Sequence, residues 1–369
     1  MGWQTDAVVD EERIRSVREQ CERFLFLPGA RHRIAQELTE LAEYAVQRQP
    51  DWYGRGGLAD EVEAQVAGLL GQEAAVFLPS GVMAQQIALR VWADDTGRDT
   101  VALHRMSHID SHESGAAWEL HRLRPRYLTG ERRLPTLDDL HQIAGPLGCV
   151  TLELPLREVD HRLPSWDEYA ALCAAAHDRG ARVHLDGARL WESTVHFGHT
   201  LGEITALADS VYVSFYKLLG GISGSALAGP APFVAAVREW RHRHGGTLVT
   251  QYPALLAAAR GLERSLPRVP EYVRYAAELA EAIAAQPGLR VSPRPPHTNA
   301  FVVYYDRDAD PMAEAALAFA EEHRIWPGRW FPADVPGWSV AECTVAETTL
   351  AWKPAEVAAM LAEILDRAS

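Results

Sequence analysis

Short apolar runs alternate with longer amphipathic stretches through the first two thirds of the chain. The apolar runs lie at 73–78, 101–103, 149–154, 183–186 and 211–215. Apolar residues recur at helical spacing at 60–70, 84–92 and 166–179. Nearly continuous apolar runs are typical of strands that are buried on both faces of a parallel sheet. The alternation therefore predicts an α/β fold, a mostly parallel sheet covered by helices on both faces.

The two ends of the chain have a different pattern. Residues 10–49 predict helices that are interrupted at Leu27-Pro28-Gly29. Towards the C-terminus, helices are expected at 271–285, 311–323 and 354–367, and strands at 300–305, 339–344 and 348–352. We therefore expect an N-terminal helical segment (1–50), a large α/β domain (51–265) and a smaller C-terminal α+β domain (266–369).

Two of the predicted strands end in residues of opposite charge. Asp186 ends the run that begins at Val183, and Lys217 follows the run at 211–215. They are about thirty residues apart, the length of one crossover between parallel strands, so their strand ends can be neighbours. Ligands of α/β proteins bind at this edge of the sheet. A salt bridge with a purely structural role is the alternative interpretation of the pair.

The use of lysine in this chain is unusual. Lys217 and Lys353 are its only lysines, while the 36 positive residues are otherwise arginine. A lysine amine can lose its proton and attack an aldehyde, whereas arginine stays protonated. A lysine beside an aspartate suits pyridoxal phosphate (PLP), because the lysine forms a Schiff base and the carboxylate keeps the pyridine nitrogen protonated.

Two loops are expected to contribute to the same site. Ser80 lies between a predicted strand and a predicted helix, where it can cap the helix and leave backbone N–H groups available to a phosphate. A simple serine cap is the alternative. Tyr53 lies in the loop at 51–57, which contains three glycines, and its ring either faces a ligand or packs against the protein.

Three histidines follow the strand at 101–103. The spacing of His104, His108 and His112 would place them on one face of a helix, which could bind a metal ion if the whole segment were helical. No second cluster completes such a site. We therefore expect no metal, and expect His108 to stack on the ring of the cofactor.

Composition limits the other functions that the chain can have. A net charge of −14 argues against a general binder of nucleic acid, and the sequence contains no apolar run of membrane-spanning length and no signal peptide. The four cysteines are scattered without the spacing of a zinc site. These features predict a cytoplasmic protein that acts on a small molecule.

The motifs resemble those of a known family, the PLP-dependent threonine aldolases and β-eliminating lyases of fold type I. The resemblance is carried by His-Leu-Asp-Gly-Ala-Arg at 184–189, by EAAVFLPSG at 73–81 and by Tyr53-Gly54. It implies a homodimer or homotetramer. It also implies roles for individual residues: Lys217 as the Schiff-base lysine, Asp186 as the pyridinium partner, His108 as the stacking ring, Ser80, Gly81 and Val82 at the phosphate, and Arg189 at the substrate carboxylate or the cofactor.

The sequence also departs from the family pattern. The family has serine and glycine on either side of the lysine, where this chain has Tyr216 and Leu218. Leu156 or Arg157 aligns with a histidine that faces the substrate hydroxyl, and the C-terminal arginine that binds carboxylate falls near Ala341. We therefore expect Arg157 and Tyr53 to join Arg189 as substrate contacts, and expect a substrate with a larger or more apolar β-substituent than that of threonine.

The resemblance implies cleavage of a β-hydroxy-α-amino acid to glycine and an aldehyde. β-Elimination and racemisation on the same fold are alternatives, because neither needs a base for a β-hydroxyl group. A catalytically inactive relative that serves as a binding partner is an alternative of another class.

Overall fold

The computed structural model describes residues 11–26 and 34–368. Internal contacts divide the chain into two units, one made of Met1–His32 with Arg268–Ser369 and the other of Arg33–Pro267. The helical segment expected at 1–50 is therefore shared between the units. Its helix α1 (Glu11–Gln20) belongs to the first unit and α2 (Ile34–Tyr44) to the second.

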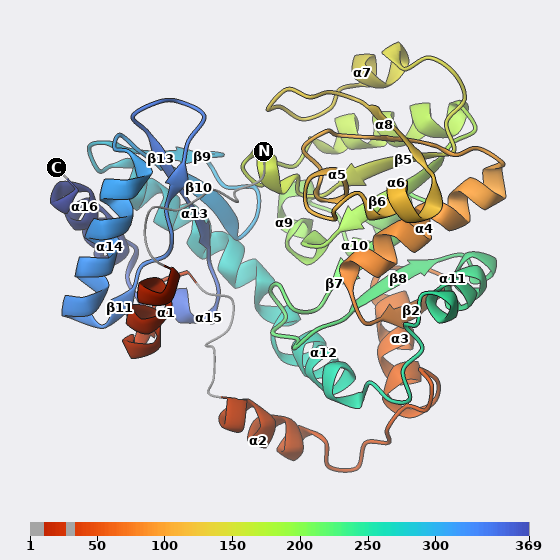
Figure 1. Ribbon diagram of the computed structural model, residues 1–369, viewed down its shortest axis with the longest axis horizontal. Helices are drawn as coiled ribbons and strands as arrows, with labels where there is room; N and C mark the ends of the chain where they lie inside the picture. The colour runs from red at the N-terminus through yellow and green to blue at the C-terminus, as the bar shows by residue number, and fades with distance from the viewer. Residues whose placement is uncertain (1–10, 27–33, 369) are drawn as a thin grey trace. The chain divides into compact units, whose positions relative to one another are not determined.

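A seven-stranded sheet forms the centre of the larger unit (Figure 1). Its spatial order is β2 (Ala74–Leu78), β8 (Ser225–Gly229), β7 (Ser210–Ser214), β6 (Arg182–Gly187), β5 (Cys149–Glu153), β3 (Thr100–Leu103) and β4 (Arg124–Tyr127). Strand β8 runs antiparallel to both of its neighbours, and the other pairs are parallel. The prediction of a mostly parallel sheet is confirmed. Strand β4 was not predicted, because Arg-Pro-Arg-Tyr at the edge of the sheet has no apolar run.

Helices cover both faces of this sheet. The long helices of the unit are α3 (Gly57–Leu69), α4 (Gly81–Thr96), α8 (Trp166–Asp178), α11 (Ala231–Arg243) and α12 (Tyr252–Arg264). One buried cluster contains residues of α3, α8 and α12, and a second contains residues of α4 and α11. In β3, Ala102 belongs to the first cluster and Val101 and Leu103 to the second, as expected of a strand buried on both faces.

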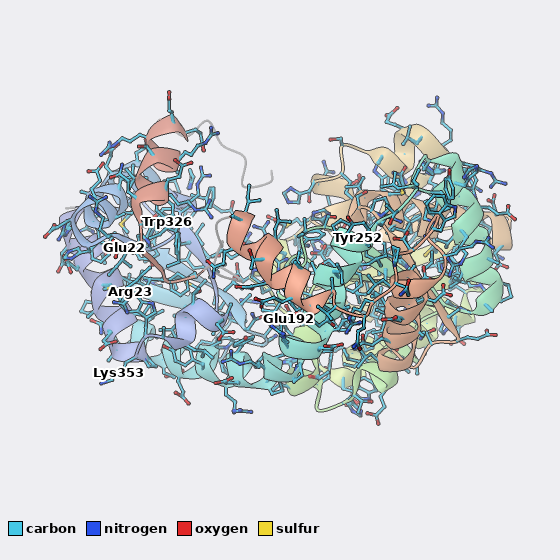
Figure 2. The ribbon with its side chains drawn as sticks, turned by 90° about the horizontal axis from the view of Figure 1, so that it is seen from below. Glu22, Arg23, Glu192, Tyr252, Trp326 and Lys353 are labelled. Carbon is cyan, nitrogen blue, oxygen red and sulfur yellow. The ribbon has the colours of Figure 1, made fainter. Side chains whose placement is uncertain are left out.

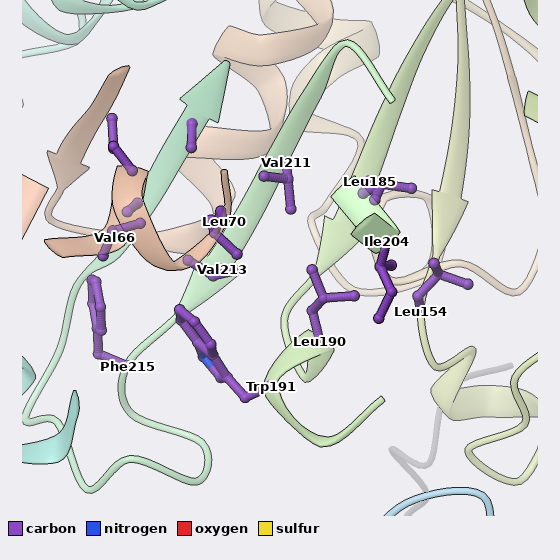
Figure 3. Packing of buried hydrophobic residues seen from close by; sticks show 14 of the residues in the cluster. Val66, Leu70, Leu154, Leu185, Leu190, Trp191, Ile204, Val211, Val213 and Phe215 are labelled. Atoms are coloured by element: carbon purple, nitrogen blue, oxygen red, sulfur yellow. The ribbon is translucent and has the colours of Figure 1, made fainter. Parts of the chain in front are cut away.

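The first of these clusters packs beneath the strands that end in the charged pair. Figure 3 shows Leu185 of β6 and Val213 of β7 near Leu190 and Trp191. Trp191 also donates a hydrogen bond from Nε1 to the carbonyl oxygen of Ser214, at 3.0 Å. The segment after β6 is thereby joined to the end of β7.

The remaining elements of the larger unit are short. They are α5 (His108–Ser111), α6 (Ala116–His121), α7 (Leu137–Gln142), α9 (Thr194–Phe197), α10 (Leu201–Thr205) and the 3-10 turns η1 (Arg157–Val159) and η2 (Leu190–Glu192). A further 3-10 turn, η3 (Leu266–Arg268), lies at the boundary between the units.

The smaller unit has α+β structure. Its antiparallel sheet has the order β12 (Phe331–Pro332), β13 (Ser339–Thr344), β10 (Ala300–Tyr305) and β9 (Leu289–Ser292). Its other helices are α13 (Val269–Ala284), α14 (Ala309–His323), α15 (Glu347–Leu350) and α16 (Pro354–Arg367). A short strand β1 (Arg23–Phe24) pairs in parallel with β11 (Ile325–Trp326), and Arg23 and Trp326 are labelled in Figure 2.

The prediction of a strand at 348–352 was wrong, because helix α15 covers residues 348–350 and a turn follows it. Thr349 favours a strand by intrinsic propensity, but its hydroxyl accepts a hydrogen bond from the backbone N–H of Ala346 (3.2 Å) and donates one to the carbonyl of Leu25 (2.6 Å). The first of these hydrogen bonds caps the helical turn and the second is a tertiary contact, and together they outweigh the local preference. Among the residues that the structure describes, no helix is long and apolar enough to cross a membrane.

Candidate active site

Three adjacent strands of the large sheet bring polar side chains into register. Glu153 of β5 pairs with Asp186 of β6, and Asp186 pairs with Tyr212 of β7. All three side chains are near the carboxyl end of the sheet, where α/β proteins bind ligands. Burial raises the pKa of Glu153 to about 8, and the negative charge of Asp186 contributes to this rise.

Asp186 has one carboxylate oxygen without a partner. The side chain is buried, and its Oδ1 accepts a hydrogen bond from the backbone N–H of Ala188 at 3.2 Å. Its Oδ2 is buried and has no hydrogen-bond partner among the described residues. A buried carboxylate oxygen is costly to leave unsatisfied. A hydrogen-bond donor on a ligand would remove this cost.

Lys217 follows β7 in a bend and lies among charged groups. Burial lowers the pKa of its amine to about 8, and the positive charge of Arg189 lowers it further. The carboxylates of Asp186 and Glu153 act in the opposite direction. A substantial fraction of this amine is therefore neutral near physiological pH and can act as a nucleophile.

The lowered pKa of Lys217 predicts how the protein captures an aldehyde cofactor. Only the neutral amine attacks, so the rate of covalent capture of PLP by cofactor-free protein should rise with pH and level off above about 8. Capture is measured by the visible absorbance of the bound cofactor in rapid-mixing experiments from pH 6 to pH 11. A midpoint near 10.5, the ordinary value for lysine, would contradict the burial of this amine.

His108 begins helix α5 and is held at two points. Its backbone N–H donates to Oε2 of Glu153 at 2.8 Å, and its Nδ1 is hydrogen-bonded to Oε1 of Glu113 at 3.0 Å. Burial lowers the pKa of His108 to about 4 and raises that of Glu113 to about 9. Both groups are therefore neutral near pH 7, which suits an imidazole that lies against an aromatic ring.

The three neighbouring histidines do not share a helical face. Only His108–Ser111 is helical, so His104 precedes the helix. Nε2 of His104 is hydrogen-bonded to the carbonyl of Arg133 at 3.0 Å, and Nε2 of His112 to Oε1 of Glu158 at 2.9 Å. Within residues 11–26 and 34–368, no group of three or more His, Cys, Asp or Glu side chains is placed to hold a metal ion.

The loop before α4 has the geometry of an anion site. Ser80 is the N-cap of this helix, as predicted, and its Oγ accepts from the backbone N–H of Met83 at 3.3 Å. The N–H groups of Gly81 and Val82 in the first turn have no partner in the described part of the chain. A Cβ at Gly81 would clash with the hydroxyl of Tyr212. This close approach connects the helix N-terminus with the strand that lies beside Asp186.

The structure places two of the three expected substrate contacts near Lys217. The charges of Arg189, which follows β6, and of Arg157 in η1 both lower the pKa of Lys217. The contacts of Tyr53 are with other residues. Its exposed ring packs edge-on against Trp52 at 5.5 Å, and its backbone N–H donates to the carbonyl of Val249 at 2.9 Å. Neither contact involves Lys217, so a role for Tyr53 at the substrate stays a prediction.

Leu156 and Arg157 both aligned with the family's histidine, and the structure separates them. Leu156 is 2% exposed and lines a small internal cavity with Leu152 and Tyr169. Arg157 is only partly buried, and its charge lowers the pKa of His108. Which of the two residues faces the substrate stays a prediction, and Arg157 is the one whose charge reaches His108 and Lys217.

Sequence reasoning missed four residues of this cluster, namely Glu113, Glu153, Tyr212 and Glu192. Glu153 could have been found, because it ends a buried strand in the same way as Asp186. Glu192 is fully buried, and burial raises its pKa to about 8. Glu192 is close enough to Arg189 and Lys217 for their charges to lower its pKa. This proximity depends on the turn η2, which has no distinct sequence pattern.

The comparisons with known proteins agree with this geometry. The sequence profile of the β-eliminating lyase family matches residues 33–308. The chain is 30% identical over 288 residues to an Arabidopsis thaliana protein named probable low-specificity L-threonine aldolase 2, with 74% of this chain and 79% of the relative covered. It is 28% identical over 247 residues to the low specificity L-threonine aldolase of Escherichia coli O157:H7, with 63% and 71% covered.

A solved structure extends the similarity to nearly the whole chain. A Listeria monocytogenes EGD-E protein, described as a candidate L-allo-threonine aldolase, superposes with a TM-score of 0.90 and 34% identity. This match covers 97% of this chain and 99% of the Listeria chain. The chain therefore belongs to the β-eliminating lyase and threonine aldolase family, the pyridoxal-phosphate-dependent family that its sequence resembles.

Proposed function

We propose that the protein cleaves a β-hydroxy-α-amino acid to glycine and an aldehyde with PLP as its cofactor. The observation that carries the proposal is the pairing of Lys217, with its lowered pKa, and Asp186, whose buried Oδ2 has no partner among the described residues. The relatives named L-threonine aldolases support the reaction class. Bound PLP supplies an aldehyde for attachment to a lysine and a pyridine ring that accepts the electrons of the broken Cα–Cβ bond.

The residues of the cluster fit this cofactor. Lys217 would provide the amine, and the unpartnered Oδ2 of Asp186 would accept a hydrogen bond from the protonated pyridine nitrogen. His108, which is held by Glu113, would stack on the ring. The first turn of α4, at Ser80, Gly81 and Val82, would hold the phosphate.

Two arginines would bind the substrate carboxylate. Arg189 and Arg157 both lie close enough to Lys217 to lower its pKa, and a guanidinium binds a carboxylate through two hydrogen bonds. Tyr53 is exposed, and its contacts with Trp52 and Val249 do not involve Lys217, so we place it in the site of a second copy in a homodimer or homotetramer. A cytoplasmic location is supported by four buried cysteines that form no disulfide.

The proposed reaction predicts a defined pair of products. Incubation of the PLP-loaded protein with L-threonine, L-allo-threonine and phenylserine should release glycine and the matching aldehyde in equal amounts from at least one of them. Amino-acid analysis measures glycine, and a reductase assay measures the aldehyde. Release of ammonia and a 2-oxo acid would show β-elimination instead, and inversion at Cα would show racemisation. No turnover of any kind by a PLP-loaded protein would favour the inactive relative.

A further inference from the structure

The cluster contains a hydrogen-bonded dyad, His112 and Glu158, to which the roles above assign nothing. Nε2 of His112 lies 2.9 Å from Oε1 of Glu158, and the same oxygen accepts a hydrogen bond from Nη1 of Arg157 at 2.7 Å. An oxygen that accepts from a guanidinium is a carboxylate acceptor, so Nε2 of His112 is the donor. This fixes the tautomer and leaves the lone pair on Nδ1, which has no hydrogen-bond partner among the described residues.

The dyad lies beside the residues that would hold the cofactor. The rings of His112 and His108 are 5.3 Å apart between centroids and tilted by 39°. Arg157, at the other side of the dyad, is near enough to Lys217 and His108 to lower the pKa of both. The side chain of Glu158 is 4% exposed and that of His112 is 19% exposed. The carboxylate is therefore shielded from water, while the imidazole is still reachable by a small molecule.

A retro-aldol cleavage needs a base for the β-hydroxyl proton, and the chain lacks the histidine that its family has after the middle strand. We propose that His112 is this base and that Glu158 is its positioning residue; the inference rests on the proposed function. The O–H bond of the β-hydroxyl group breaks and its proton passes to Nδ1 of His112. The O–H electron pair becomes the second bond of the aldehyde C=O, and the Cα–Cβ bond breaks. Its electron pair stays with the Cα fragment, where bound PLP would delocalise it; Cα then takes up a proton from water to give glycine, and His112 returns the proton that it accepted to water.

The other buried acids and bases of the cluster are engaged differently. Glu153 accepts two backbone hydrogen bonds, from His108 and Arg157. Burial holds the pKa of His108 near 4, so it is a weak base at pH 7, and burial keeps Glu113 protonated. His112 is the imidazole of this cluster that is oriented by a carboxylate and is not required to lie against the cofactor ring.

The test separates cleavage from chemistry that needs no hydroxyl base. His112→Asn should lower kcat for cleavage of the best β-hydroxy amino acid by about a hundred-fold or more, the usual contribution of a general base. It should leave the visible absorbance of bound PLP unchanged, together with the rate at which glycine exchanges its α-proton in D2O, followed by NMR. Added imidazole should restore part of the cleavage by His112→Gly. His141→Asn, at an exposed position on α7, is the matched control and should behave as the wild type.

Glu158 is tested by the same pair of rates. Glu158→Gln should lower cleavage about ten-fold with α-proton exchange unchanged, and Glu158→Asp should recover part of the loss. Two results would overturn the inference: unchanged cleavage in His112→Asn, or an equal fall of cleavage and exchange, which would give His112 a structural role. A wild-type protein that exchanges the α-proton of glycine but cleaves no β-hydroxy amino acid would refute the proposed function itself, and the inference with it.

Discussion

Lys217→Ala is expected to abolish covalent binding of PLP and to lower turnover by about a thousand-fold or more, the scale of loss when a covalent catalyst is removed. The reason is that Lys217 supplies the reactive amine of the site. Lys217 is the amine that lies among Asp186, Glu153 and Arg189, and burial lowers its pKa to about 8. The variant should show no visible absorbance that borohydride can fix to the protein. Peptide mapping of the reduced wild-type protein should locate the cofactor at Lys217.

The chain offers a matched control for this variant. Lys353 is its only other lysine, and it is exposed at the N-cap of α16 in the other unit (Figure 2). Lys353→Ala should retain wild-type absorbance and turnover. A Lys217→Ala protein that turns over at the wild-type rate would refute the PLP assignment, because no second buried amine exists to replace it.

Asp186→Asn is expected to retain PLP but to lower kcat by about a hundred-fold or more. The amide lacks the negative charge that keeps the pyridine nitrogen protonated, and electron withdrawal by the ring depends on that proton. The substitution should also change the pKa of Lys217. Asp186 raises the pKa of that amine, so its loss should move the midpoint of cofactor capture to a pH below about 8. Steady-state kinetics and the pH profile of capture measure the two effects independently.

The control for Asp186→Asn is the same substitution at Asp178, an exposed residue at the end of α8. It should change neither kcat nor the midpoint of capture. If Asp186→Asn kept full kcat, the assignment of Oδ2 as the partner of the pyridine nitrogen would be wrong.

Much of the fold was predictable because local physics determines it. Continuous apolar runs identified five of the seven strands, β2, β3, β5, β6 and β7, since a sheet covered by helices buries both faces of its strands. Ser80 was identified as a helix cap from its place between an apolar run and an amphipathic stretch, and the structure confirms the cap. Local propensity failed at Thr349, where hydrogen bonds to Ala346 and Leu25 hold a helical turn.

The candidate site was predictable where one residue ends one strand. Asp186 and Lys217 could be found because parallel strands bring their carboxyl ends to one edge of the sheet. His108 was chosen from its place after a strand, but its partner Glu113 depends on the single turn of α5.

The sequence alone thus determined most strands of the large sheet, the family and the lysine–aspartate pair, because each depends on residue type and on spacing along the chain. Only the tertiary structure decided which side chains meet. It buried Leu156, brought the charge of Arg157 near Lys217, and joined His112 to Glu158, 46 residues away. The register of strands and the path of loops set these contacts, and both depend on the packing of the whole domain.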